Sequence, residues 1–179
     1  MYEPSVLIAG IGNIFLGDDA FGVEVARRLS ARVLPHGVRV ADFGIRGLDL
    51  TYAMLYGDQD VTILVDAAPR GGTPGTVYLI EPEAAGGKAE QGLAVLDAHS
   101  MDPAKILHTV RSMGGEPKRV FVVGCEPLTL GPDEGLMGLS APVELAVGQA
   151  ADLIESLVIR ILAGEPVVNP VLNVIQEGA

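Results

Sequence analysis

Short apolar runs separated by segments with helical spacing constrain the fold of this chain more than any other feature. The clearest run, Asp60–Asp66, is crowded with β-branched residues and stops abruptly at an acid. Ser5–Ala9 and Arg119–Cys125 have the same character. Such runs are typical of strands that are buried on both faces of a parallel sheet and are connected by helices. We therefore predict an α/β fold, a single-domain three-layer sandwich with a mostly parallel, doubly wound sheet.

Weaker patterns complete this order of elements. Two shorter strands are expected at Val38–Asp42 and Thr76–Ile80, and a long amphipathic helix is expected after Ser140 or Ala141, where Pro142 suits the first turn. We assign residues 1–163 to the α/β domain and residues 164–179 to a loosely ordered tail. The other helices are predicted from Ala20 to about Arg32, from Leu48 to the stop at Gly57, and after His99 with Ser100 as its cap.

Composition narrows the function classes. Of 179 residues, 49% are hydrophobic and only 4% aromatic, so the core must be aliphatic. The formal net charge of −11 would repel a polyanion, which argues against nucleic acid as a partner. Cys125 is the only cysteine, which excludes an intramolecular disulfide and a cysteine cluster for a metal. No apolar run has the length of a membrane span, and we expect a cytoplasmic protein that does not contact a membrane.

The segment after the first strand combines a glycine turn with negative charge. Gly10-Ile11-Gly12 has the form of a phosphate-binding turn, but Phe15 occupies the position of the third glycine. Asp18 and Asp19 follow, and their carboxylates would repel a pyrophosphate. A nucleotide-binding domain is therefore the weaker interpretation. The acids favour a cation or a polarised water, and one of them is also expected to cap the helix that follows.

Parallel strands bring their carboxyl ends to one edge of a sheet, so Asp18, Asp19 and Asp66 should meet there. His99, which precedes a later helix, would add an imidazole. Carboxylates with imidazole suit nickel, zinc or iron, and an acidic crevice of this kind would activate a water for hydrolysis. Each residue also has a structural alternative, because Asp66 can start an Asx turn and His99 can be a surface histidine. We interpret Cys125 as a core residue.

The motifs together resemble a known family. The stretch from Gly10 to Gly22, with Gly-x-Gly-Asn, an acid pair and a further glycine, is similar to the N-terminal signature of the endopeptidases that mature the large subunit of nickel–iron hydrogenases. Val65-Asp66-Ala67 with Pro74-Gly75-Thr76 looks like the second element of that family, and His99 before a helix looks like the third. The resemblance runs from about Val6 to Ala163.

The resemblance implies a cytosolic protease that removes a C-terminal extension from the large-subunit precursor after nickel insertion. The metal-contacting positions of the family correspond to Asp19, Asp66 and His99, and the first two also become the catalytic candidates. The nickel would belong to the substrate, so no tightly bound cofactor is expected. Whether the carboxylates act as metal ligands or as a general base stays open. Position 19 is Asp where some members carry Glu, and Phe21 stands where smaller residues are common.

Substrate contacts are expected from the same edge. The resemblance also implies that the precursor is cut after a basic residue close to the metal, so a cleft held negative by Asp18, Asp19 and Asp66 would attract both that residue and the metal. The loop that contains Asp42, Gly44 and Gly47 follows the second strand and is expected to position the C-terminal peptide.

Two further interpretations keep the same residues. The chain can be a non-catalytic, nickel-dependent checkpoint protein that binds the loaded precursor while cleavage occurs elsewhere. It can also be a general metallopeptidase that carries its own ion. Two carboxylates and one histidine from separate loops should bind a metal only weakly by themselves. This argues against a metallopeptidase that carries its own ion.

Overall fold

A five-stranded sheet in the order β2-β1-β3-β5-β4 organises the protein, as seen in a computed structural model that describes residues 4–82 and 102–167. The first four strands in this order are mutually parallel, and β4 runs antiparallel to β5 at the edge. The predicted mostly parallel, doubly wound sheet is confirmed. The elements are β1 (Val6–Ile11), the 3-10 helix η1 (Gly17–Ala20), α1 (Phe21–Ser30), β2 (Val38–Gly44), α2 (Gly47–Tyr56), β3 (Val61–Ala67), β4 (Val77–Ile80), α4 (Pro103–Ser112), β5 (Arg119–Cys125) and α5 (Ala141–Leu162).

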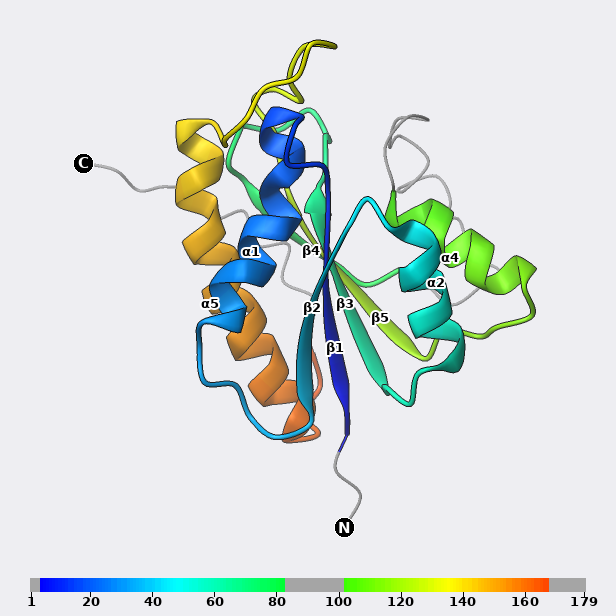
Figure 1. The fold of residues 1–179 in the computed structure, drawn as a ribbon. Helices are drawn as coiled ribbons and strands as arrows, with labels where there is room; N and C mark the ends of the chain where they lie inside the picture. Colours follow the sequence, from blue (N-terminus) through cyan, green and yellow to red (C-terminus); the bar gives the residue numbers. More distant parts are fainter. Residues whose placement is uncertain (1–3, 83–101, 168–179) are drawn as a thin grey trace.

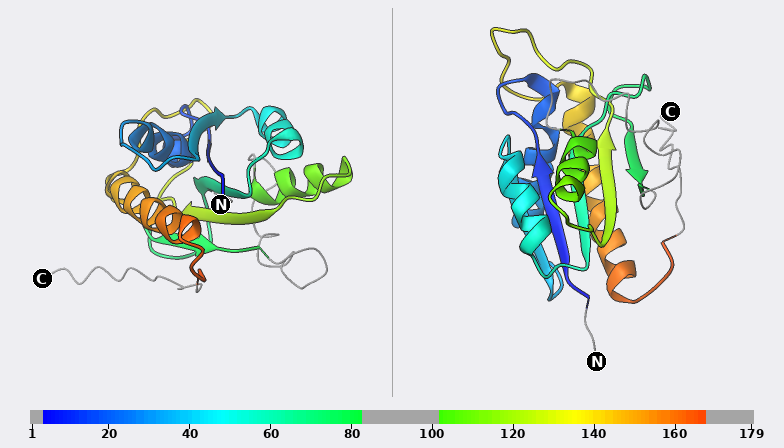
Figure 2. Two further views of the ribbon diagram at one scale, coloured as in Figure 1. Left: turned by 90° about the horizontal axis from the view of Figure 1, so that it is seen from below. Right: turned by 90° about the vertical axis from the view of Figure 1, so that its right-hand side faces the viewer.

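Helices cover both faces of the sheet, which gives three layers (Figures 1 and 2). Helices α1 and α5 lie on one face, and α2 and α4 lie on the other. Side chains alternate along each strand, so Val6 and Ile8 of β1 join the core under α1 and α5, whereas Leu7 and Ala9 join the core under α2 and α4. Every residue of β1 and β3 is buried, as their apolar sequences predict.

The starts of two helices differ from the sequence prediction. Helix α1 begins at Phe21 with Ala20 at its N-cap and no side-chain cap bond, so the expectation that Asp18 or Asp19 caps it is wrong. Both acids belong to η1 instead. Helix α4 is capped by Asp102, whose carboxylate accepts a hydrogen bond from the Ala104 amide at 2.8 Å. Ser100, which the sequence suggested as the cap, lies outside the described residues. A Pro at the first turn follows Asp102, which is the normal pairing at a helix start.

The ends of the chain are described only in part. Within residues 164–167 of the predicted tail, Glu165 and the Pro166 carbonyl contact Arg160, and Val167 packs against the core. None of the helices in the described ranges is both long and apolar enough to cross a membrane.

Helix α1 lies unusually close to the sheet because of two glycines. A Cβ atom added to Gly22 would lie 2.0 Å from the Val65 carbonyl oxygen and 2.2 Å from the Ile11 carbonyl oxygen. One added to Gly10 would lie 2.4 Å from the Gly22 carbonyl oxygen. No Cβ tolerates such contacts, so the first turn of α1 rests directly on the backbones of β1 and β3.

We expect Gly22→Ala to lower the free energy of unfolding by at least about 2 kcal/mol, because rigid backbone atoms cannot move away from the new methyl group. Gly148→Ala in α5 is the matched control. The nearest atom to its added Cβ is the end of the Arg28 side chain at 3.6 Å, so alanine should raise stability by up to about 1 kcal/mol. Urea unfolding of both variants measures the two effects. Equal effects of the two substitutions would contradict the close approach of α1.

Candidate active site

Two of the predicted acids lie close together at the point where the strand order of the sheet reverses. The first three strands have the spatial order β2-β1-β3, so the switch point lies between β1 and β3 at the carboxyl ends of the strands. Asp19 lies in η1 just beyond β1, and Asp66 lies near the end of β3. This edge faces the upper part of Figure 1, where α1 begins. Asp19 lies close enough to Asp66 for its charge to raise the pKa of Asp66.

The glycine turn places Asp19. Gly12 has a φ of 142°, and an added Cβ would lie 1.8 Å from the Asp19 carbonyl oxygen, so η1 folds back over the turn itself. The Asn13 amide then donates to Asp19 Oδ2 at 2.9 Å, while Asn13 Oδ1 accepts from the Phe15 amide at 3.0 Å. Within the described residues Asp19 Oδ1 accepts no hydrogen bond, and it is not among the buried unsatisfied atoms. That oxygen is available for a cation or a water.

Asp66 lies deeper than Asp19. Its side chain is 4% exposed, and its Oδ1 accepts from the Ala67 amide at 2.8 Å. Burial, followed by repulsion from Asp19, holds the pKa of Asp66 well above its ordinary value, and Asp102 contributes in the same direction. Burial also raises the pKa of Asp19, against the lowering effect of the Asn13 amide. Both acids therefore bind a proton more readily than free aspartate. A bound cation would likewise offset the cost of burying their negative charge.

Asp102 is a third acid near this site that sequence reasoning missed. It is 4% exposed, and burial raises its pKa against the hydrogen bond from the Ala104 amide. Asp102-Pro103 was a readable signal in the sequence, because an acid directly before a proline often marks an N-cap and a first turn.

His99 lies outside the described residues, so the imidazole expected beside Asp19 and Asp66 is not placed. Among the residues that the structure describes, no three His, Cys, Asp or Glu side chains form a group that could hold a metal ion. The described part of the proposed ligand set is the carboxylate pair.

Asp18 has a structural role that the sequence did not indicate. It is 0% exposed, and its carboxylate accepts hydrogen bonds from the amides of Leu128, Thr129 and Ser140 and from Ser140 Oγ, at 2.7 to 3.0 Å. Each hydrogen bond to a charged group contributes about 1.5–3 kcal/mol. The expected contact of Asp18 with substrate is corrected accordingly, because both oxygens already bind the 128–140 loop.

The second strand ends beside the glycine turn, at the same edge of the sheet as the acid pair. The register between β1 and β2 shifts by one residue, so that Gly10 pairs with Asp42 and Ile11 with Gly44. Gly44 has a φ of 52°, and its carbonyl accepts from the Gly12 amide at 3.0 Å. The Asp42 side chain is exposed, its backbone oxygen accepts from Arg46, and Gly47 begins α2.

Two buried groups lie at the end of β5. Cys125 is 0% exposed and burial raises its pKa to about 12, so the interpretation of Cys125 as a core residue is confirmed. Glu126, which sequence reasoning missed, is 5% exposed and accepts from the amides of Arg70 and Gly71 at 2.8 and 3.1 Å and from the Tyr78 hydroxyl at 2.8 Å. Glu126 therefore fixes the loop that follows Asp66.

The doubly wound sheet, with an acid pair at its switch point, defines the class as an α/β protein with a candidate site at the carboxyl ends of its strands. Residues 23–157 match the family model described as hydrogenase maturation protease. The chain belongs to this family of peptidases, which act on hydrogenase large-subunit precursors.

Individual relatives agree. A putative hydrogenase maturation protease from Methanocaldococcus jannaschii is 33% identical over 156 residues, covering 86% of this chain and 96% of the relative. The hydrogenase 2 maturation protease of Escherichia coli is 30% identical over 149 residues, covering 82% and 86% respectively. The solved structure of the hydrogenase maturating endopeptidase HybD from E. coli aligns with a TM-score of 0.70 at 28% identity, over 88% of this chain and 93% of that one.

The raised pKa of Asp66 predicts a pH-dependent stability. Ionised Asp66 is disfavoured in the folded state, so its contribution to stability is fully present below about pH 4, where unfolded aspartate is protonated. The contribution is lost as the pH rises through the higher folded pKa. Asp66→Asn keeps the oxygen that bonds Ala67 and cannot ionise. Without added metal, we expect this variant to melt at a higher temperature than the unsubstituted protein at pH 8.

The difference in melting temperature between Asp66→Asn and the unsubstituted protein should shrink as the pH falls toward 4. Asp58→Asn, an exposed acid before the other end of β3, should leave the difference near zero at every pH. Thermal unfolding in chelator-treated buffers from pH 4 to 8 tests both expectations. A stabilisation by Asp66→Asn that grows toward acid pH would contradict a raised pKa.

Proposed function

We propose that this chain is the cytoplasmic endopeptidase that removes the C-terminal extension of a nickel–iron hydrogenase large-subunit precursor after nickel insertion. The observation that supports it most is the meeting of Asp19 and Asp66 at the switch point, with the pKa of each raised. Membership of the hydrogenase maturation protease family supports the kind of substrate.

In this proposal the substrate supplies the nickel, and the enzyme holds no tightly bound cofactor. Asp19, Asp66 and His99 contact the metal in the precursor and so recognise that it is loaded. The open Oδ1 of Asp19 suits this contact, because carboxylate and imidazole groups are good partners for nickel. A precursor without nickel would leave the acids facing each other without a cation, which disfavours its binding.

The same carboxylates serve hydrolysis. A water attacks the scissile carbonyl carbon, its proton passes to a carboxylate of the pair, and the departing amide nitrogen receives a proton as the C–N bond breaks. The raised pKa values suit this exchange, because each acid can take up and release a proton nearer to neutral pH than free aspartate does. The loop with Asp42, Gly44 and Gly47 lies at the same edge and positions the C-terminal peptide.

We expect Asp19→Asn, Asp66→Asn and His99→Ala to lower the processing rate of a nickel-loaded precursor by at least about 100-fold, the usual effect of losing a proton-transfer group. Asp58→Asn makes the same chemical change before the opposite end of β3 and should process normally. Mass spectrometry of purified precursor, incubated with each variant with and without nickel, detects the shortened product.

Several outcomes would contradict the proposal. Full processing of the precursor by the Asp66→Asn variant would show that the reaction does not need the carboxylate pair. Binding of the loaded precursor by the unsubstituted protein without any product would instead favour the checkpoint interpretation. Stoichiometric nickel or zinc in the isolated chain, measured by elemental analysis, would contradict a metal supplied by the substrate.

A further inference from the structure

Five large apolar side chains are exposed on two loops beside the candidate site. Their exposed fractions range from 36% for Ile14 to 71% for Met137. An exposed apolar patch of this kind commonly marks an interaction surface. We call this surface the edge patch, and it consists of Ile14, Phe15, Leu128, Leu136 and Met137.

The two loops of the edge patch hold each other in place. Leu16 and Leu136 form a parallel bridge, the Gly17 amide donates to the Leu136 carbonyl at 2.7 Å, and the Leu136 amide donates to the Phe15 carbonyl at 2.8 Å. The buried Asp18 carboxylate binds the amides of Leu128 and Thr129 from below. The exposed side chains therefore extend from an ordered backbone, which lowers the entropy lost when a partner binds.

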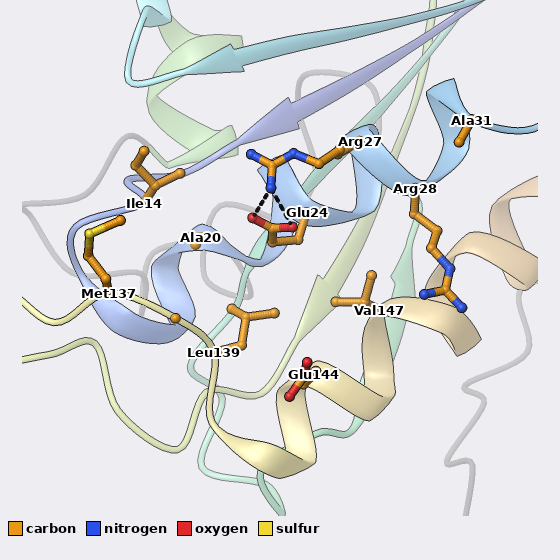
Figure 3. Close-up of a pocket in the computed structure, with 11 residues that line it drawn as sticks. Ile14, Ala20, Glu24, Arg27, Arg28, Ala31, Met137, Leu139, Glu144 and Val147 are labelled. Carbon is orange, nitrogen blue, oxygen red and sulfur yellow. Dashed lines mark hydrogen bonds and ion pairs between the residues drawn. The ribbon is translucent and has the colours of Figure 1, made fainter.

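A groove continues from the edge patch between α1, α5 and residues 137–139. Its volume is about 710 Å³, and Ile14 and Met137 belong to both the patch and the groove wall (Figure 3). Leu139 and Val147 add apolar surface deeper in the groove. The Glu24–Arg27 ion pair lies along the α1 wall, with an N···O distance of 3.0 Å.

We propose that the edge patch and this groove form the docking surface for the folded body of the precursor, as distinct from the C-terminal peptide that is cut. This inference rests on the proposed function. It is supported by continuity, because the loop that carries Ile14 and Phe15 leads directly into η1 and Asp19. A precursor seated on the patch would thus present its C-terminal segment to the acid pair.

Charge defines the chemistry of the partner surface. Asp133 and Glu134 are exposed in the same loop as Leu136. The groove is lined by two acids and two bases, and so its charges balance: Glu24, Glu144, Arg27 and Arg28. The chain as a whole has a net charge of −11. The partner surface that complements the edge patch is therefore an apolar centre with basic groups opposite Asp133 and Glu134, because opposite charges around an interface raise the association rate and disfavour other partners.

The test introduces charge into the patch at Phe15→Glu and Met137→Glu. Val33→Glu is the matched control, because Val33 is 97% exposed. It lies on the connection between α1 and the start of β2, whereas the edge patch lies beyond the ends of the parallel strands. Binding of purified nickel-loaded precursor is measured by titration in an Asp66→Asn background, which separates docking from cleavage. Single-turnover cleavage at saturating enzyme is measured with Asp66 intact.

We expect each patch variant to weaken precursor binding by about tenfold or more, the effect of losing one central interface side chain. The cleavage rate of each patch variant at saturating enzyme should stay within about threefold of the rate of the unsubstituted protein. A variant that has lost its fold would instead cleave more slowly at every enzyme concentration. Val33→Glu should change neither quantity. Asp133→Asn with Glu134→Gln should slow association and flatten its salt dependence.

If both patch variants bind the precursor as tightly as the Val33→Glu variant does, the proposed docking surface is wrong. The proposed function would still stand. Absence of cleavage by the unsubstituted protein would overturn the proposed function, and the binding comparison would still report on the docking surface. Phe15→Ala and Met137→Ala, which only truncate the side chains, replace the Glu variants if those fail to fold, and they too must weaken binding.

Discussion

The close approach of α1 to the sheet is the constraint on which the site depends. With no side chain at Gly10 or Gly22, the first turn of the helix rests on the carbonyl oxygens of Ile11 and Val65. Gly12 lets η1 fold back over the end of β1, because its positive φ and the contact with the Asp19 carbonyl exclude any other residue. A wider gap between helix and sheet would move Asp19 away from Asp66, and the charge of Asp19 would then raise the pKa of Asp66 less.

Buried carboxylates organise the loops around that centre. Asp18 binds the 128–140 loop and Glu126 binds the loop after β3, in each case mainly through backbone amides. Asp102 performs the related task at the start of α4. Backbone amides are fixed donors, so a buried carboxylate that accepts hydrogen bonds from them holds the surrounding loop in one conformation. Part of the acidic excess of the chain is therefore structural and does not face substrate.

Much of the architecture was predictable from local pattern. The strand Arg119–Cys125 and the helix after Ser140 occur where the sequence placed them, and Asp66 lies near the end of β3 as expected. The family signature is local too, since Gly10 to Gly22 is one uninterrupted segment. What local pattern could not give is which of two adjacent acids is bound by the 128–140 loop. Asp18 and Asp19 have the same side chain, and only the 128–140 loop, more than a hundred residues away, distinguishes them.

The sequence by itself determined the α/β class, the order of the elements and the carboxyl edge as the place of the site, because apolar periodicity and glycine position act through neighbouring residues. Tertiary structure alone decided that Asp18 is buried, that Asp102 lies near Asp66, and that Phe15 and Met137 share one exposed patch. These facts depend on contacts between distant segments and on burial, which sets both pKa values and exposure. No local spacing contains that information.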